Sequence, residues 1–183
     1  MKIEPIWQPA QQQRIFRALM EAMARPGTIH DIGAWLAEAP AWRGVLACLL
    51  DAKSSLADCH HLVEDSDWPL LQARPERPEA ADYLLCQGSQ EDKLTAKMGS
   101  LSCPDQSATL VIQVANLGEG PNFLTMRGPG IPTSRNLAVG GLAASWLTMR
   151  DRHLSFPLGI DLILADQQKI TAIPRTTRLE NTP

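Results

Sequence analysis

The segment that most restricts the fold of this chain is Ser155–Thr177, which reads SFPLGIDLILADQQKITAIPRTT. It holds two short apolar runs separated by a polar turn, and glycine and proline bound them. Runs of this length that are rich in Ile and Leu are typical of buried strands. We therefore predict two adjacent antiparallel strands, Asp161–Asp166 and Ile170–Ile173, with Ile163 and Ile173 buried.

The turn between these strands decides which residue faces Asp161, the one charged residue in the first apolar run. A buried carboxylate needs a partner. A three-residue turn at Gln167–Lys169 would place Asp161 opposite Arg175, whereas a two-residue turn would place it opposite Pro174. We predict an Asp161–Arg175 salt bridge that orients the following loop. The alternative is that Asp161 holds Arg175 in place as a phosphate contact.

Two short segments are candidates for binding an anion or the backbone of a partner. Arg175, Thr176 and Thr177 follow the second strand, and a glycine-rich turn lies at 127–130. Glycines let backbone N–H groups approach an anion closely, although turns of this type are common as purely structural features, and that interpretation is preferred. The candidate substrate- or phosphate-binding residues are Arg127, Gly128, Gly130, Arg175, Thr176 and Thr177. No catalytic residue can be identified.

Composition excludes several classes of protein. With 183 residues, 44% hydrophobic and 20% charged, the chain is expected to form one globular domain spanning residues 1–183. A net charge of −3 provides no basic field for nucleic acid. No apolar run approaches the ~20 residues that cross a bilayer. The N-terminus lacks the apolar core of a signal peptide, so we expect a cytoplasmic protein.

The residues that usually carry metal or cofactor chemistry form no convincing pattern. Asp58-Cys59-His60-His61 looks like a metal site, but neighbouring residues on a strand point to opposite faces, so we expect a solvated surface and no metal. None of the five lysines lies in a strongly apolar run, so no Schiff-base lysine and no pyridoxal phosphate are expected. A triad of Ser155, His153 and Asp161 lacks the supporting G-x-S-x-G motif.

Periodicity along the rest of the chain favours an α/β fold. Helices are expected at Ala10–Ala24, Ala41–Leu50, Gln90–Met98 and Leu137–Asp151, with a short helix around Pro69–Gln72. Strands are expected at Thr28–Ile32, Ser54–His61, Tyr83–Cys86 and Ser107–Asn116, with Asn122–Arg127 as the hairpin partner of the last one. Interleaved strands, helices and hairpins favour a mixed sheet covered by helices in three layers.

The apolar residues of these helices also predict which side chains are buried. The core-facing stripe of the first helix is expected to be Ile15, Phe16, Leu19, Met20 and Met23. Trp146 lies on the stripe of the last helix, with Leu142 and Met149, and should be internal. Trp7 and Trp35 lie in polar or broken segments, so we expect them at the surface as anchors for partners.

Four segments carry a recognisable pattern: FRALMEAMARPG (Phe16–Gly27), ATLVIQVANL (Ala108–Leu117), RGPGI (Arg127–Ile131) and FPLGIDLIL…AIPRTT (Phe156–Thr177). Together they resemble one family, the PhnH subunit of bacterial carbon–phosphorus lyase. The matches keep the same order along the chain. FPLGID followed by IPRTT is the specific part, whereas the glycine turn alone would not be.

The resemblance implies a fold similar to that of pyridoxal-phosphate transferases but without the cofactor. It also implies a required but non-catalytic subunit that works with PhnG, PhnI, PhnJ and possibly PhnL in alkylphosphonate catabolism. In that reaction methylphosphonate displaces adenine from ATP, giving ribose 1-methylphosphonate 5-triphosphate. The isolated chain is expected to form a homodimer or to expose an apolar patch. The alternative is a free-standing small enzyme or phosphate-ligand-binding protein that uses Arg127, Arg175 and Thr176.

Overall fold

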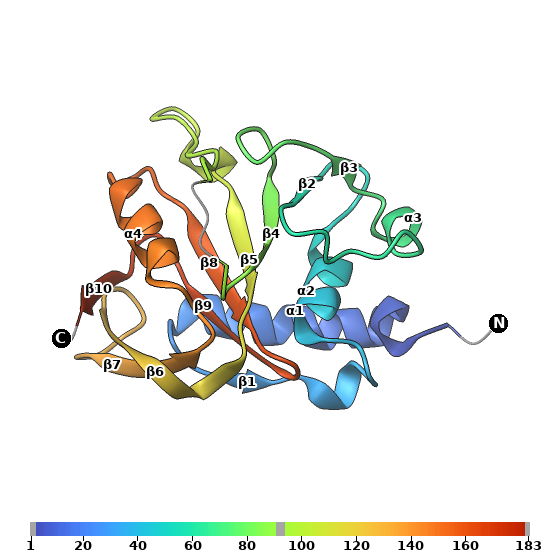
Figure 1. The fold of residues 1–183 in the computed structure, drawn as a ribbon, viewed down its shortest axis with the longest axis horizontal. Coiled ribbons are helices and arrows are strands. Elements are labelled where there is room, and N and C mark those ends of the chain that lie inside the picture. Colours follow the sequence, from blue (N-terminus) through green and yellow to red (C-terminus); the bar gives the residue numbers. More distant parts are fainter. Residues whose placement is uncertain (1–2, 91–93, 182–183) are drawn as a thin grey trace.

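The computed structural model describes residues 3–90 and 94–181, which form an α/β fold around a mixed seven-stranded sheet (Figure 1). The strand order is β1-β9-β8-β5-β4-β2-β3. The bounds are β1 (His30–Asp31), β9 (Lys169–Ile173), β8 (Asp161–Ala165), β5 (Thr109–Gln113), β4 (Tyr83–Gln87), β2 (Ser55–Asp58) and β3 (Arg74–Pro75). Strands β8, β5, β4, β2 and β3 are parallel, whereas β9 and β1 are antiparallel to their neighbours. The predicted mixed sheet is therefore confirmed.

The C-terminal hairpin forms as predicted. Strands β8 and β9 pair in an antiparallel register in which Ala165 lies opposite Ile170, and Ile163 and Ile173 are buried. The connecting turn has two residues at its tip, because the backbone N–H of Asp166 donates to the carbonyl oxygen of Lys169. Extended by one residue beyond the Leu162–Ile173 pair, this register places Asp161 opposite Pro174, as expected for a two-residue turn.

A second sheet corrects the predicted pairing of the middle of the chain. It has the order β10-β6-β7, with β6 (Asn116–Arg127), β7 (Arg135–Gly140) and β10 (Arg178–Asn181), and all its pairs are antiparallel. The predicted hairpin between Ser107–Asn116 and Asn122–Arg127 is wrong, because β5 pairs with β4 and β8 instead. After Gln113 the chain leaves the large sheet and enters the second sheet, where β6 pairs with β7 and β10.

The predicted helix at Leu137–Asp151 is also wrong in its first half. Leu137 and Val139 are buried while Ala138 between them is half-buried, which is the two-residue period of a strand. Gly141 has a φ of +71°, and a Cβ there would approach Ala115 within 2.9 Å. The chain turns at this glycine, and α4 (Ala144–Arg152) begins only after it.

Three layers arise because both faces of the large sheet are covered. Helices α1 (Pro9–Ala24) and α2 (Ala41–Leu49) cover one face, where Val111 and Ile163 belong to their core cluster. The opposite face carries Leu110 and Leu162 and packs against α4 and the three-stranded sheet. Figure 1 shows α4, β6, β7 and β10 gathered at the left. Adjacent residues of β5 and β8 thus serve two separate cores.

The buried stripe of α1 differs from the predicted one. Ile15 and Leu19 are buried together with Ala18 and Ala22, whereas Phe16 is 45% exposed and Met20 is 56% exposed. The helix packs against α2, β9, η1 and η2, and the alanines Ala18 and Ala22 enter the core there while the larger Phe16 and Met20 do not. The predicted end of the helix before Pro26 is confirmed, since α1 stops at Ala24.

The three tryptophans considered in the sequence analysis differ in burial. Trp146 is buried, as predicted. Trp7 and Trp35 are only partly exposed, because both pack against the core beneath α1 and α2. Each keeps only part of its surface open, and their role as anchors for partners stays a prediction. Their segments look open in sequence, but the chain folds each one back onto the helices.

The remaining helical segments are short. They are the 3-10 helices η1 (Pro5–Trp7), η2 (Gly33–Trp35) and η3 (Pro104–Gln106), and α3 (Trp68–Leu71). Residues 91–93 of the predicted helix Gln90–Met98 lie outside the described residues, and its described part, Gln90 and 94–98, is not helical. None of the helices within 3–90 and 94–181 combines the length and hydropathy required to cross a bilayer.

Candidate functional site

The fold brings the two predicted binding segments together, and we call residues 127–130 and 175–178 the arginine corner. Strand β10 pairs with β6, which places Arg178 opposite Arg127. Gly128 has a φ of +142°, and a Cβ there would lie 2.9 Å from the carbonyl oxygen of Thr176. At Gly130 a Cβ would lie 2.1 Å from the carbonyl oxygen of Ala24. Both glycines thus let backbone segments pack closely.

Arg175 is occupied by contacts within the chain. Its backbone N–H donates to Asp161 Oδ1 at 2.6 Å, and its Nη2 donates to Asp161 Oδ2 at 2.6 Å. Its Nη1 donates to the carbonyl oxygen of Pro104. The register sets Asp161 level with Pro174, so the side chain of Arg175 reaches one position back to make this pair. The contact does not need the three-residue turn.

The side chains of the other predicted residues differ in exposure and in whether they already have a bonding partner. Arg127 forms an ion pair with Glu180 at 2.9 Å, and both side chains are more than half exposed. Thr176 is exposed, whereas Thr177 is fully buried and its Oγ1 has no hydrogen-bond partner. The structure therefore leaves Thr176 as the accessible hydroxyl of the predicted set.

Sequence reasoning missed Arg178 as a member of this corner. It is exposed, and it has no ion pair among residues 3–90 and 94–181. A cavity of about 350 Å³ is lined by Pro129, Leu154, Phe156, Arg175, Thr176 and Arg178. No carboxylate lines it, so its charge is positive. The sequence signal was available, since Arg178 directly follows the IPRTT segment.

A second missed residue lies beneath the corner. Arg150 of α4 is fully buried, and its Nη2 donates to the carbonyl oxygens of Pro174 at 2.9 Å and Thr177 at 2.6 Å. Burial lowers the pKa of Arg150, although Asp151 opposes this effect. Arg150 therefore holds both ends of the loop that carries Arg175 and Thr176. Its position four residues after Trp146 places it on the buried stripe of the helix.

The structure assembles neither a catalytic triad nor a metal cluster from the sequence candidates. The His153 ring lies 2.7 Å from the carbonyl oxygen of Met149, and Asp161 is paired with Arg175. Asp58 accepts hydrogen bonds from the backbone N–H groups of Leu62 and Val63. Within the described ranges, no three His, Cys, Asp or Glu side chains are grouped so that they could hold an ion.

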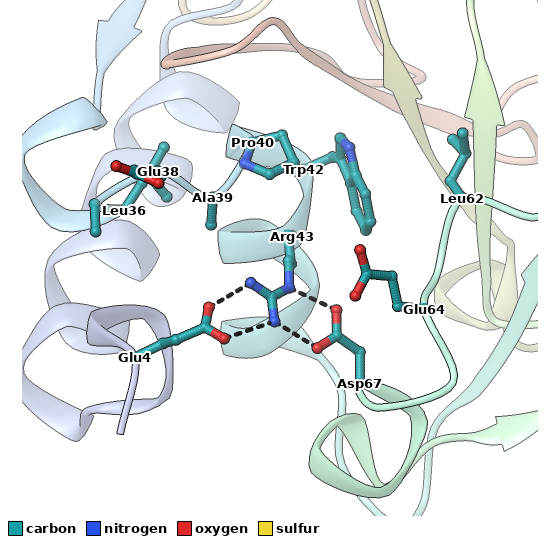
Figure 2. A pocket seen from close by; sticks show the side chains of 11 residues that line it. Glu4, Leu36, Glu38, Ala39, Pro40, Trp42, Arg43, Leu62, Glu64 and Asp67 are labelled. Carbon is teal, nitrogen blue, oxygen red and sulfur yellow. Dashed lines mark hydrogen bonds and ion pairs between the residues drawn. The ribbon is translucent and has the colours of Figure 1, made fainter. Parts of the chain in front are cut away.

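A separate cavity of about 510 Å³ lies beside α2, and Figure 2 shows the guanidinium of Arg43 between the carboxylates of Glu4 and Asp67. The hydrogen bonds that Arg43 donates to Asp67 raise the pKa of Arg43 more than burial lowers it. Glu38 and Glu64 also line this cavity. Carboxylates outnumber the one cation, so the cavity disfavours an anion, and Arg43 acts there as a structural tie.

Known proteins resemble this chain along nearly its full length. The family described as "Bacterial phosphonate metabolism protein (PhnH)" matches residues 6–180. The "Putative C-P lyase subunit protein HtxG" of Stutzerimonas stutzeri is 37% identical over 175 residues, which are 95% of this chain and 88% of that protein. The "Alpha-D-ribose 1-methylphosphonate 5-triphosphate synthase subunit PhnH" of Rhizobium meliloti (strain 1021) is 29% identical over 180 residues, 92% of this chain and 90% of the relative.

Proposed function

Because this chain belongs to the PhnH family of bacterial phosphonate metabolism proteins, we propose that it is a subunit of a carbon–phosphorus lyase complex. The observation that carries the proposal is the match over residues 6–180, which includes both cores and the arginine corner. The two relatives are named as subunits, one of a C–P lyase and one of the synthase of ribose 1-methylphosphonate 5-triphosphate.

In this proposal the complex couples methylphosphonate to ATP with release of adenine, and the chain is required without performing the chemistry itself. Its partners are PhnG, PhnI and PhnJ, with PhnL as a further component, and the complex works in the cytoplasm. Two observations support a non-catalytic role. Arg175 is already paired with Asp161, and the residues of the sequence-level triad make separate contacts.

Exposed apolar side chains support an interface role. Phe156 is 83% exposed beside Arg178 in the corner cavity, and Phe16 and Met20 are about half exposed on α1. Large apolar residues that stay in water are typical of surfaces that meet partners. The isolated chain is expected to cover part of this surface as a homodimer.

The test is co-expression of the tagged chain with PhnG, PhnI and PhnJ, followed by affinity capture and size-exclusion chromatography. We expect the partners to elute with the chain. Phe156→Ser and Phe16→Ser should weaken their capture, whereas Leu70→Ser, a matched change at an exposed leucine of α3, should not. A chain that captures none of the three partners contradicts the proposal and favours a free-standing phosphate-ligand-binding protein.

The likeness to pyridoxal-phosphate transferases, without their cofactor, is part of the same proposal. A purified chain with a visible absorption band that borohydride removes would contradict it, since that band marks an internal aldimine.

A further inference from the structure

A tight turn beside the arginine corner holds the most exposed large apolar side chain that the structure describes. Phe156 lines the corner cavity and is 83% exposed. Ser155 and Leu158 exchange backbone hydrogen bonds of 3.2 and 2.8 Å, so Phe156 lies in a closed turn. A Cβ at Gly159 would lie within 3.2 Å of Leu154 and Arg175, which shows how closely this turn packs against the neighbouring loop. The aromatic ring is thus fixed in water, where it contributes little to the stability of the fold.

The charged residues that line the corner cavity have one sign. They are Arg175 and Arg178, and the charge of Arg175 is already matched by Asp161. Arg178 is exposed and has no ion pair within the ranges 3–90 and 94–181. The carboxylate on the same strand, Glu180, pairs with Arg127 instead. An open guanidinium therefore lies beside an apolar wall, which is formed by Pro129, Leu154 and Phe156.

This combination of a cation and an apolar wall fits a carboxylate with an apolar neighbour better than a phosphate. A guanidinium pairs with a carboxylate through two parallel hydrogen bonds, and the two charges cancel. A phosphate dianion would bring two charges to the guanidinium of Arg178 and would leave the apolar wall uncovered. The glycine turn does not compensate, because carbonyl oxygens of Thr176 and Ala24 occupy the space beside Gly128 and Gly130. Oxygen atoms in these places repel an anion.

Strand β10 offers a backbone edge at the same place. It is the outer strand of the three-stranded sheet (Figure 1), and among the described residues it pairs with β6 alone. Arg178 is its first residue and also lines the cavity. The outer edge of such a strand presents N–H and C=O groups that a further strand can join. A charged side chain on an edge discourages pairing, but an arginine without an ion pair favours a segment that is acidic.

We propose that the arginine corner and the free edge of β10 bind an extended acidic segment of a partner subunit. A carboxylate of the segment pairs with Arg178. An apolar side chain two positions away packs against Phe156, because alternate residues of a strand share one face. The fixed turn favours binding, since the aromatic anchor is in place before the partner arrives. The inference rests on the proposed function, because the segment is taken to come from another subunit of the complex.

The first test is an NMR titration of the full chain with three peptides with blocked ends, TFTETFT, TFTQTFT and TSTETST. The palindromic pattern allows either strand direction. We expect saturable shifts at the amides of residues 178–180 with TFTETFT, and about tenfold weaker binding of the other two, each of which lacks one of the two contacts. Absence of saturable shifts with TFTETFT, or equal binding of TFTQTFT, overturns the proposal. Inorganic phosphate that saturates these amides more tightly than TFTETFT also overturns it, since that marks a phosphate site.

Arg178→Glu tests the charge argument by reversing the sign of the open group. The variant should bind TFTETFT about tenfold more weakly and should prefer TFTKTFT, in which lysine replaces glutamate. The melting temperature should not change, because the side chain of Arg178 is exposed. Arg77→Glu, at an exposed arginine that follows β3, is the matched control and should alter neither the peptide preference nor the melting temperature. An unchanged preference in Arg178→Glu contradicts the proposal.

Co-expression of tagged chains with the partners of the proposed complex separates this inference from the proposed function. We expect Arg178→Glu and Phe156→Ser to capture less partner than the unaltered chain. Leu101→Ser, at a leucine that is 77% exposed outside the corner cavity, and Arg77→Glu should capture as much as the unaltered chain. If no chain captures a partner, the unaltered one included, the proposed function is contradicted. If the unaltered chain and both corner variants capture equally, only the docking of an acidic segment at this corner is contradicted.

Discussion

Arg43 and Arg150 are both withdrawn from water, but the protein satisfies them in opposite ways. The Arg43 side chain is 17% exposed and lies between two carboxylates, of which Asp67 is itself 2% exposed. Arg150 is fully buried, is held mainly by backbone carbonyls, and keeps an unpartnered Nε. The pKa of Arg43 is raised by Asp67, whereas burial lowers that of Arg150.

The comparison shows that Arg43 ties parts of the fold together, whereas Arg150 supports a loop. Arg43 of α2 joins Glu4, at the start of η1, to Asp67, just before α3, and four of its five N–H donors make these hydrogen bonds. Arg150 joins α4 to the loop that carries Arg175 and Thr176. Among the described residues its ion pair is with the half-exposed Asp151, and Asp161 adds a weaker attraction. Desolvating a charge with so little compensation is costly, so Arg150 contributes less to stability than its depth suggests.

The largest effect is expected from Arg43→Met. The change keeps an apolar stem but leaves Asp67 buried without either of its guanidinium hydrogen bonds. Breaking a buried pair by removing one partner costs about 3–5 kcal/mol of unfolding free energy. Chemical denaturation checks it, and Glu4→Gln, at the half-exposed partner, should cost about 1 kcal/mol or less. Equal losses in the two variants would mean that burial of Asp67 is not the cause.

Arg150→Met sharpens the comparison. No buried carboxylate is left behind, so the loss should be smaller, about 2 kcal/mol for two carbonyls that lose a donor. The effect should be local: the amide of Thr177, which donates to the carbonyl oxygen of Pro174 at 2.9 Å, should exchange faster with deuterium. A loss as large as that of Arg43→Met, with unchanged exchange at Thr177, would contradict the assigned role.

The smallest effect is expected from Asp82→Asn, a change at a carboxylate near the surface. Burial alone would raise the pKa of Asp82, but hydrogen bonds from Lys97 and Ser55 outweigh it and hold the pKa below 3.8. A depressed carboxylate pKa stabilises the fold above the ordinary value, and this contribution is lost as pH falls through the folded value. Asp82→Asn should therefore flatten the fall of the melting temperature below about pH 4. A profile parallel to that of the unaltered chain would show no linkage to Asp82.

The candidate site was predictable only in part. Two segments that lie far apart in the sequence, 127–130 and 175–177, carry glycine, arginine and threonine, and the fold brings them together. The sequence predicted the Asp161–Arg175 salt bridge, and this pair forms. It could not show that the pair forms across a two-residue turn, because that depends on how far the side chain of Arg175 reaches across the hairpin. Arg150 was missed because it lies in no distinctive motif, and Arg178 was missed although it directly follows the IPRTT segment.

Local pattern by itself determined the C-terminal hairpin, the end of α1 before Pro26 and the buried Trp146. Each depends on residues close together in the chain, where turn and strand preferences act directly. Only the tertiary structure decided that β6 joins β7 and β10 rather than β5, and that the alanines of α1 face the core while Phe16 and Met20 stay in water. These choices rest on contacts between distant segments, and hydrophobic burial rewards any such pairing that covers a sheet face, so no short stretch of sequence specifies the partner.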